Sequence, residues 1–218
     1  MVAQVRDDAL LLPLPQVSLV GSLVVPADPV GIVLFAHGSG SSRFSPRNRY
    51  VAQVLNEARL ATLLADLLTP AEEAVDARTG HLRFDIVLLA ERLTGIVDWM
   101  PSHPALAALP VGLFGASTGA GAALRTAVAR PHVAAVVSRG GRPDLAEPYL
   151  PQVRVPVLLI VGGADLPVLA LNREALARLG GEARLEVVPG ATHLFEEPGA
   201  LEQVAVLARD WFLRWLAT

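Results

Sequence analysis

A serine lies in a tight, glycine-flanked turn near the middle of the chain. Residues 111–124 read VGLFGASTGAGAAL, so an apolar run typical of a strand leads into Gly115-Ala-Ser117-Thr-Gly119 and then into small residues typical of a helix. A G-x-S-x-G turn of this kind strains the backbone and exposes the serine hydroxyl. The helix N-terminus behind Ser117 also favours negative charge on a reacting oxygen. The pattern predicts a nucleophilic Ser117, provided that other segments supply a base and an orienting acid.

The same glycines admit a second interpretation, because Gly115-x-x-x-Gly119-x-Gly121 resembles the glycine-rich turn of the short-chain dehydrogenases. A dinucleotide fingerprint should open the first βαβ unit and be followed by an acidic residue about 20 positions on. This turn lies in the middle of the chain, and the next strand ends at Arg139 instead. All 18 basic residues are arginine, so the lysine that such dehydrogenases use is absent. We therefore favour the hydrolytic interpretation and expect no cofactor.

The composition predicts one compact domain, covering residues 1–218. Hydrophobic residues make up 52% of the chain and charged residues 18%, which favours a large buried core. The net charge of −3, with scattered arginines, gives no indication of a nucleic-acid partner. There is no cysteine, which excludes disulfides, thiolate metal sites and cysteine nucleophiles.

We expect neither a signal peptide nor a membrane-spanning segment, and hence a cytoplasmic protein. Arg6, Asp7 and Asp8 precede a short apolar run that Pro13 and Pro15 interrupt, unlike the basic and then apolar order of a signal peptide. No apolar stretch reaches the length needed to cross a bilayer.

Short apolar runs alternate with longer helical patterns, which predicts a buried, mostly parallel sheet with helices on both faces. The expected strands are 17–25, 32–36, 61–65, 111–114, 134–137, 157–161 and 185–188, and the expected helices are 49–58, 84–99, 119–129, 169–179 and 199–216. Because no helix separates residues 17–25 from residues 32–36, we expect these two strands to form an antiparallel hairpin. Only residues 138–155 lie between two later strands, which leaves no room for a large lid.

Two further residues with suitable chemistry follow predicted strands. Asp165 comes after strand 157–161, and His193 comes after strand 185–188. Ligands bind beyond the carboxyl ends of the strands in such sheets, so both residues should meet Ser117 at one edge. A serine needs a base, and the base needs an orienting acid. The chain order of serine, acid and histidine is that of the α/β-hydrolases.

The whole chain resembles an α/β-hydrolase of the dienelactone hydrolase-like group. The resemblance rests on the His37-Gly38 turn, the Gly115–Gly119 turn, and the segments Gly163-Ala164-Asp165 and Gly190-Ala191-Thr192-His193. It implies that Ser117 is the nucleophile, His193 the general base and acid, and Asp165 the orienting carboxylate. It also implies an oxyanion hole formed by the backbone N–H groups of Thr118 and Ser39.

The enzymes that give the group its name use a cysteine nucleophile, whereas this chain has none. The resemblance therefore better supports a serine carboxylesterase that acts on small, soluble esters. Thioester hydrolysis, acyl transfer and peptide hydrolysis can proceed through the same acyl-enzyme. A non-catalytic binding protein on the same fold is the alternative from another class.

Several assignments stay open at this stage. Asp165 could instead cap the helix that follows it, and Glu196 and Glu197 are alternative acids that lie close to His193 in sequence. We expect His37 to support the oxyanion loop more than to contact substrate. No His, Asp and Glu cluster has metal-ligand spacing, so we expect no metal.

Arginines follow two of the strands that end at the predicted site. Arg43 follows the oxyanion loop, and Arg139 follows strand 134–137. Because guanidinium groups suit carboxylates and phosphates, one hypothesis is that Arg43 or Arg139 binds an anionic group of the substrate. The alternative is that the arginines of these segments form ion pairs with Asp66, Glu72 or Asp144. The sequence is compatible with a monomer or a homodimer.

Overall fold

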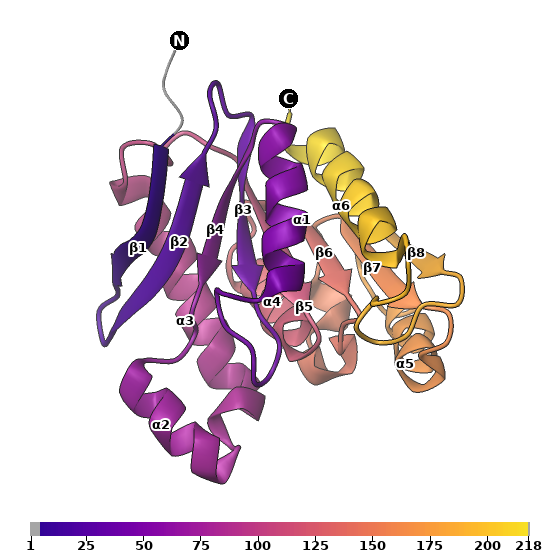
Figure 1. The fold of residues 1–218 in the computed structure, drawn as a ribbon. Coiled ribbons are helices and arrows are strands. Elements are labelled where there is room, and N and C mark those ends of the chain that lie inside the picture. Colours follow the sequence, from indigo (N-terminus) through magenta and orange to yellow (C-terminus); the bar gives the residue numbers. More distant parts are fainter. Residues whose placement is uncertain (1–4, 218) are drawn as a thin grey trace.

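One sheet of eight strands, covered by helices on both faces, forms the centre of the computed structural model, which describes residues 5–217 (Figure 1). The strand order is β1-β2-β4-β3-β5-β6-β7-β8. Neighbouring strands from β4 through β8 run parallel, whereas β1 and β2 add an antiparallel ribbon at one edge. The carboxyl ends of the parallel strands therefore meet at one edge of the sheet.

The strands are β1 (Val5–Pro13), β2 (Ser18–Val25), β3 (Gly31–Ala36), β4 (Leu60–Ala65), β5 (Val111–Ala116), β6 (Val133–Arg139), β7 (Val157–Gly162) and β8 (Ala183–Val188). The α-helices are α1 (Pro46–Glu57), α2 (Pro70–Thr79), α3 (Ile86–Trp99), α4 (Thr118–Ala129), α5 (Leu166–Leu176) and α6 (Ala200–Leu216). Short 3₁₀ helices occupy Leu82–Phe84, Met100–Ser102, Pro143–Ala146 and Leu150–Gln152.

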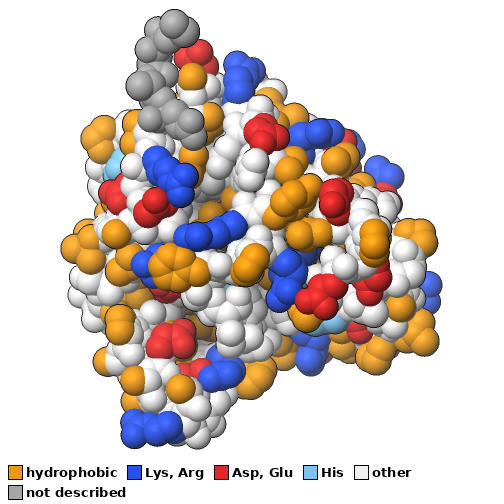
Figure 2. Space-filling view, in the orientation of Figure 1, with side chains coloured by type: hydrophobic (Ala, Val, Ile, Leu, Met, Phe, Trp, Pro, Cys, Tyr) orange, Lys and Arg blue, Asp and Glu red, His pale blue; other side chains and the backbone are white. Residues whose placement is uncertain are grey.

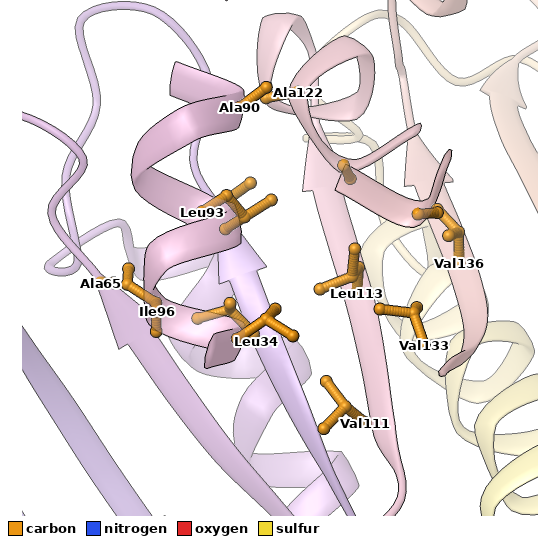
Figure 3. Packing of buried hydrophobic residues seen from close by; sticks show 14 of the residues in the cluster. Leu34, Ala65, Ala90, Leu93, Ile96, Val111, Leu113, Ala122, Val133 and Val136 are labelled. Atoms are coloured by element: carbon orange, nitrogen blue, oxygen red, sulfur yellow. The ribbon is translucent and has the colours of Figure 1, made fainter. Parts of the chain in front are cut away.

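Alternation along each strand divides the core into two layers. Leu34 of β3 packs with α3 and α4, whereas the next residue, Phe35, packs with α1 and α6 on the opposite face. Figure 3 shows the first layer, in which Leu93 and Ile96 of α3 lie among strand side chains. In the second layer, Phe35 and Phe114 have ring centroids 4.7 Å apart. Both faces of the central strands are thus buried, which explains their continuous apolar sequences.

Most of the expected elements are present, within a few residues of their predicted ends. The predicted hairpin between residues 17–25 and 32–36 is wrong, because β4 lies between β2 and β3. β2 pairs instead with β1 on one side and with β4 on the other. β3 is buried along its whole length between two parallel neighbours, a position that an antiparallel hairpin partner would disrupt.

One strand and one α-helix were not predicted from the sequence. β1 reads VRDDALLLP and is mostly exposed, so it lacks the apolar character of the central strands. α2 begins with a capping box, in which the Thr69 hydroxyl accepts the Glu72 N–H at 3.2 Å and the Glu72 carboxylate accepts the Thr69 N–H at 2.8 Å. The T-x-x-E spacing was the available signal for this helix.

The segment between β6 and β7 holds only the 3₁₀ helices Pro143–Ala146 and Leu150–Gln152, so no lid covers this edge of the sheet in the described residues. Within residues 5–217, no helix combines the length and the apolar character needed to cross a membrane.

We predict that Leu93→Ala lowers the free energy of unfolding by about 2–5 kcal/mol, because it leaves a cavity under α3. Chemical denaturation monitored by circular dichroism measures the change. The matched control is Leu11→Ala on β1, where the side chain is 57% exposed and the expected change is within about 0.5 kcal/mol. Equal effects of the two substitutions would contradict the assignment of Leu93 to the core.

Candidate active site

Ser117 occupies a single strained position between β5 and α4. Its backbone has φ +50° and ψ −121°, a region that side-chain-bearing residues rarely adopt. Neighbouring segments hold this conformation, because the Ser117 N–H donates to the Arg139 carbonyl at 3.2 Å and the Ser117 carbonyl accepts the Arg142 N–H at 3.0 Å. The residue is partly exposed at the end of the strand. The turn has the geometry that the G-x-S-x-G pattern predicts.

The glycines of the motif permit a close approach of α4 to the sheet. A Cβ atom at Gly115 would lie 2.4 Å from the Cα of Ala120, and one at Gly119 would lie 2.3 Å from the Ala36 carbonyl oxygen. Both distances are too short for any side chain. The two glycines are therefore required by the packing that forms the turn.

Asp165 and His193 form a hydrogen-bonded pair at the same edge of the sheet. The His193 Nδ1 atom lies 2.7 Å from the Asp165 Oδ2 atom. With Nδ1–H donating to the carboxylate, Nε2 carries the lone pair that can accept a proton. Asp165 also occupies the N-cap position of α5, but its side chain makes no capping hydrogen bond there. Its carboxylate is thus directed to the histidine.

The backbone at the end of β6 and just after it links this pair to the serine. Arg139 holds the Ser117 N–H, and the following residue, Gly140, lies against the histidine ring. A Cβ atom at Gly140 would be 3.6 Å from the His193 Cε1 atom, which is bonded to both ring nitrogens. On the other side of the serine, a Cβ atom at Gly38 would lie 3.0 Å from the Ser117 Cβ atom. Sequence analysis did not single out Gly38 or Gly140 for this packing role.

The two expected oxyanion donors lie together, but one of them is engaged. The Ser39 N–H donates to the Thr118 hydroxyl oxygen at 3.0 Å. Thr118 is the first residue of α4, where a backbone N–H has no acceptor within the helix. The Thr118 N–H is therefore the readier donor of the two, and Ser39 must leave the Thr118 hydroxyl before it can bind a substrate oxygen.

His37 is buried beneath the loop that carries Ser39. Its Nδ1 atom lies 3.0 Å from the Gly38 carbonyl oxygen, and its Nε2 atom lies 3.3 Å from the Leu67 backbone nitrogen. Both ring nitrogens thus have backbone partners, which the ring would have to release to contact a substrate.

The arginines near the site differ in their partners. Arg43 forms an ion pair with Asp66 and also donates its backbone N–H to that carboxylate at 2.8 Å. Arg142 pairs with Asp144, with a closest N–O distance of 2.7 Å. These are two of the ion pairs considered from the sequence, and Glu72 pairs instead with Arg92 at 2.8 Å. Arg139 differs from them all, because no carboxylate of the described chain lies within 4.0 Å of it.

Glu197 holds the loop on which His193 lies. One of its carboxylate oxygens accepts the Thr192 N–H at 3.0 Å and the Thr192 hydroxyl at 2.6 Å. The hydroxyl bond, followed by the backbone bonds, lowers the pKa of the Glu197 carboxyl from its ordinary value. Phe195 has φ +55° in the same loop, and its side chain is buried against the sheet. The sequence presented Glu197 only as a substitute acid, whereas the histidine partner is Asp165.

Across residues 5–217, His, Asp and Glu side chains form no cluster of three or more that could hold a metal ion.

Known proteins that are similar to this chain identify its family. A family model described as the dienelactone hydrolase family matches residues 24–217. A solved structure titled dienelactone hydrolase from Anabaena variabilis is 59% identical, with a TM-score of 0.95, over 98% of this chain and 99% of that one. This chain belongs to the dienelactone hydrolase family.

Three further proteins are similar to this chain in fold or in sequence. The esterase Est1E from Butyrivibrio proteoclasticus shares the fold with a TM-score of 0.81 at 16% identity, covering 97% of this chain and 100% of that one. Two proteins of Mycobacterium tuberculosis strains, each named "Putative phosphoribosyl transferase", are 59% identical over 95% of this chain. This chain spans only 46% of the length of those two relatives.

We predict that Glu197→Gln lowers the melting temperature more at pH 7 than at pH 3. The folded-state pKa of Glu197 lies below its unfolded value of about 4.3, so its stabilising contribution is present above that pH. The contribution is lost as the pH falls through the folded pKa. Thermal unfolding at both pH values measures it, with the exposed Glu174→Gln in α5 as control. The same difference in melting temperature at both pH values would contradict this role.

Proposed function

We propose that this protein is a serine hydrolase that cleaves small carboxylic esters through an acyl-enzyme. Ser117 is the nucleophile, His193 the general base and acid, and Asp165 the residue that orients the imidazole. The observation that carries the proposal is the 2.7 Å contact between His193 Nδ1 and Asp165 Oδ2, on the same edge as the strained Ser117 turn. Membership of a hydrolase family supports it.

The chemistry follows from this arrangement. As Ser117 Oγ bonds to the ester carbonyl carbon, His193 Nε2 takes the hydroxyl proton and the carbonyl oxygen becomes an oxyanion. The Thr118 N–H stabilises that charge, helped by the dipole of α4. The intermediate collapses as the ester C–O bond breaks, and the leaving alkoxide takes the proton from His193. Water then attacks the acyl-enzyme by the reverse proton path, releasing the acid and free Ser117.

The open edge of the sheet supports small substrates. Only two single-turn 3₁₀ helices stand between β6 and β7, so the described chain has no domain that could enclose a long acyl chain. A cavity of about 660 Å³ lies beside the loop after β3 and is lined in part by Gly40, Ser41 and Phe44. Its lining does not include Ser117 or His193, so it offers room only for a part of the substrate away from the bond that is cleaved.

Thioesters, peptides and acyl acceptors other than water fit the same acyl-enzyme chemistry, and a screen of leaving groups and acceptors separates them. Phosphoribosyl transfer, which the names of the two Mycobacterium tuberculosis proteins print, is a different reaction and has no support in this candidate site. The proteins that carry that name are about twice as long, whereas the dienelactone hydrolase structure at the same identity matches this chain from end to end.

We predict that a fluorophosphonate probe labels the wild-type protein once and leaves Ser117→Ala unlabelled, as read by intact mass. Asp165→Asn should label and turn over 4-nitrophenyl acetate slowly, with kcat reduced on the order of 10⁴-fold, because the imidazole loses its orienting charge.

The control is Ser102→Ala, which removes an exposed serine hydroxyl after α3 and should label like the wild type. Absence of an adduct on folded wild-type protein would overturn the proposal and favour a non-catalytic binding protein. Labelling of Ser117→Ala would assign the nucleophile to another residue.

A further inference from the structure

The Thr118 hydroxyl is a buried polar group with an unused proton. Thr118 is the first residue of α4, and only 4% of it is exposed. A threonine hydroxyl can donate one hydrogen bond and accept two. Its oxygen accepts the Ser39 N–H at 3.0 Å, whereas no group among residues 5–217 accepts its own proton. Because a buried donor without an acceptor is costly, an acceptor brought by a ligand would form a favourable hydrogen bond here.

The backbone of the same residue has a second unused proton. The Thr118 N–H lies in the first turn of α4, where the helix offers no acceptor, and no other group of the described chain accepts it. The nitrogen and the hydroxyl oxygen of one threonine are separated by only two carbon atoms, so a single ligand oxygen can contact both. The positive end of the α4 dipole is at the same place, which favours a ligand oxygen with negative charge.

The Ser39 N–H holds the hydroxyl in place. Ser39 lies on the loop after β3, 79 positions from Thr118, and its hydrogen bond restricts rotation of the threonine side chain. A hydroxyl that accepts a hydrogen bond is polarised, which strengthens the hydrogen bond that it donates. The Ser39 N–H can therefore stabilise negative charge through the Thr118 hydroxyl, without breaking its own hydrogen bond.

These donors adjoin the candidate nucleophile. Thr118 follows Ser117 directly, and a Cβ atom at Gly38, the residue before Ser39, would lie 3.0 Å from the Ser117 Cβ atom. The loop after β3 and the first turn of α4 thus meet beside Ser117. When Ser117 attacks a carbonyl group, the carbonyl oxygen is only two bonds from the Ser117 oxygen. Its negative charge therefore develops next to these donors.

We propose that the Thr118 hydroxyl is a catalytic group that donates a hydrogen bond to the oxyanion, together with the Thr118 N–H, and that the Ser39 N–H acts through it. This assignment rests on the proposed serine hydrolase function. As the bond from Ser117 Oγ to the carbonyl carbon forms, the carbonyl π electrons move to the oxygen, which accepts the Thr118 O–H as a hydrogen bond.

No proton leaves Thr118 in this step, because His193 takes the proton of Ser117. An O–H group binds an anionic oxygen more strongly than a neutral carbonyl oxygen. The contribution of the hydroxyl is therefore larger in the transition state than in the bound substrate, so it raises kcat more than it lowers KM.

The test compares Thr118→Val, which keeps the shape of the side chain without the hydroxyl, with Thr118→Ser, which keeps the hydroxyl. We expect kcat for 4-nitrophenyl acetate to fall about 10²–10³-fold in Thr118→Val, with KM changed less than about threefold, as for the loss of one oxyanion donor. Fluorophosphonate labelling of Ser117 should slow by a similar factor. Thr118→Ser should keep kcat within about tenfold of the wild type, because it retains the donor.

Thr126→Val is the matched control. Thr126 lies on the same helix, nine positions beyond Ser117, is 0% exposed, and donates its hydroxyl proton to the Ala90 carbonyl at 3.2 Å. This substitution also removes a buried hydroxyl, so it should lower stability in chemical denaturation but leave kcat unchanged.

Wild-type or higher kcat in Thr118→Val would overturn the proposal, since the hydroxyl would then only occupy the Ser39 N–H, and its removal would free that donor. Should Thr118→Val fail to fold, Thr118→Ala also removes the hydroxyl, and wild-type kcat in that variant would equally overturn the proposal. A wild-type protein that does not react with the fluorophosphonate probe would overturn the proposed function itself. Full activity of Thr118→Val or Thr118→Ala would leave that function intact, so the two failures are distinguishable.

Discussion

The contact between helix α4 and the ends of β3 and β5 is the constraint on which the candidate site depends. Gly115 and Gly119 bring helix backbone against strand backbone, which leaves Ser117 no relaxed conformation. Hydrogen bonds to the backbone of residues 139 and 142 hold Ser117 in this conformation. The end of β6 and the residues just after it therefore also position Ser117. The packing of both core layers thus maintains the strained backbone of Ser117, which would adopt a lower-energy conformation in an isolated peptide.

Much of the architecture could be predicted from the sequence because burial on both faces leaves a clear pattern. Central strands such as β3 and β7 are continuously apolar, and polar residues come directly after them. The Asp165–His193 contact could be anticipated for the same reason, since parallel strands deliver their following residues to one edge. For residues that directly follow parallel strands, the sequence pattern alone therefore predicts which edge of the sheet they share.

Features that depend on particular partners could not be predicted in this way. β1 is exposed and charged, and the order of β2, β4 and β3 is decided by pairing between strands far apart in sequence. The acceptor of the Ser39 N–H, the Thr118 hydroxyl, is 79 positions away in the sequence. Arg43 and Arg139 were equal candidates for binding an anion, and only the three-dimensional contacts separate a paired guanidinium from an unpaired one.

Both described ends of the chain lie at the edge of the sheet opposite Ser117. Val5 of β1 pairs with Val25 at the end of β2, and Leu216 of α6 packs beside Gly31 at the start of β3 (Figure 1). Figure 2 shows the molecule from the same side, with charged and apolar side chains mixed across this face. A polypeptide joined to either end would therefore depart from the far side of the molecule. Such an attachment need not cover the edge of the sheet that carries Ser117.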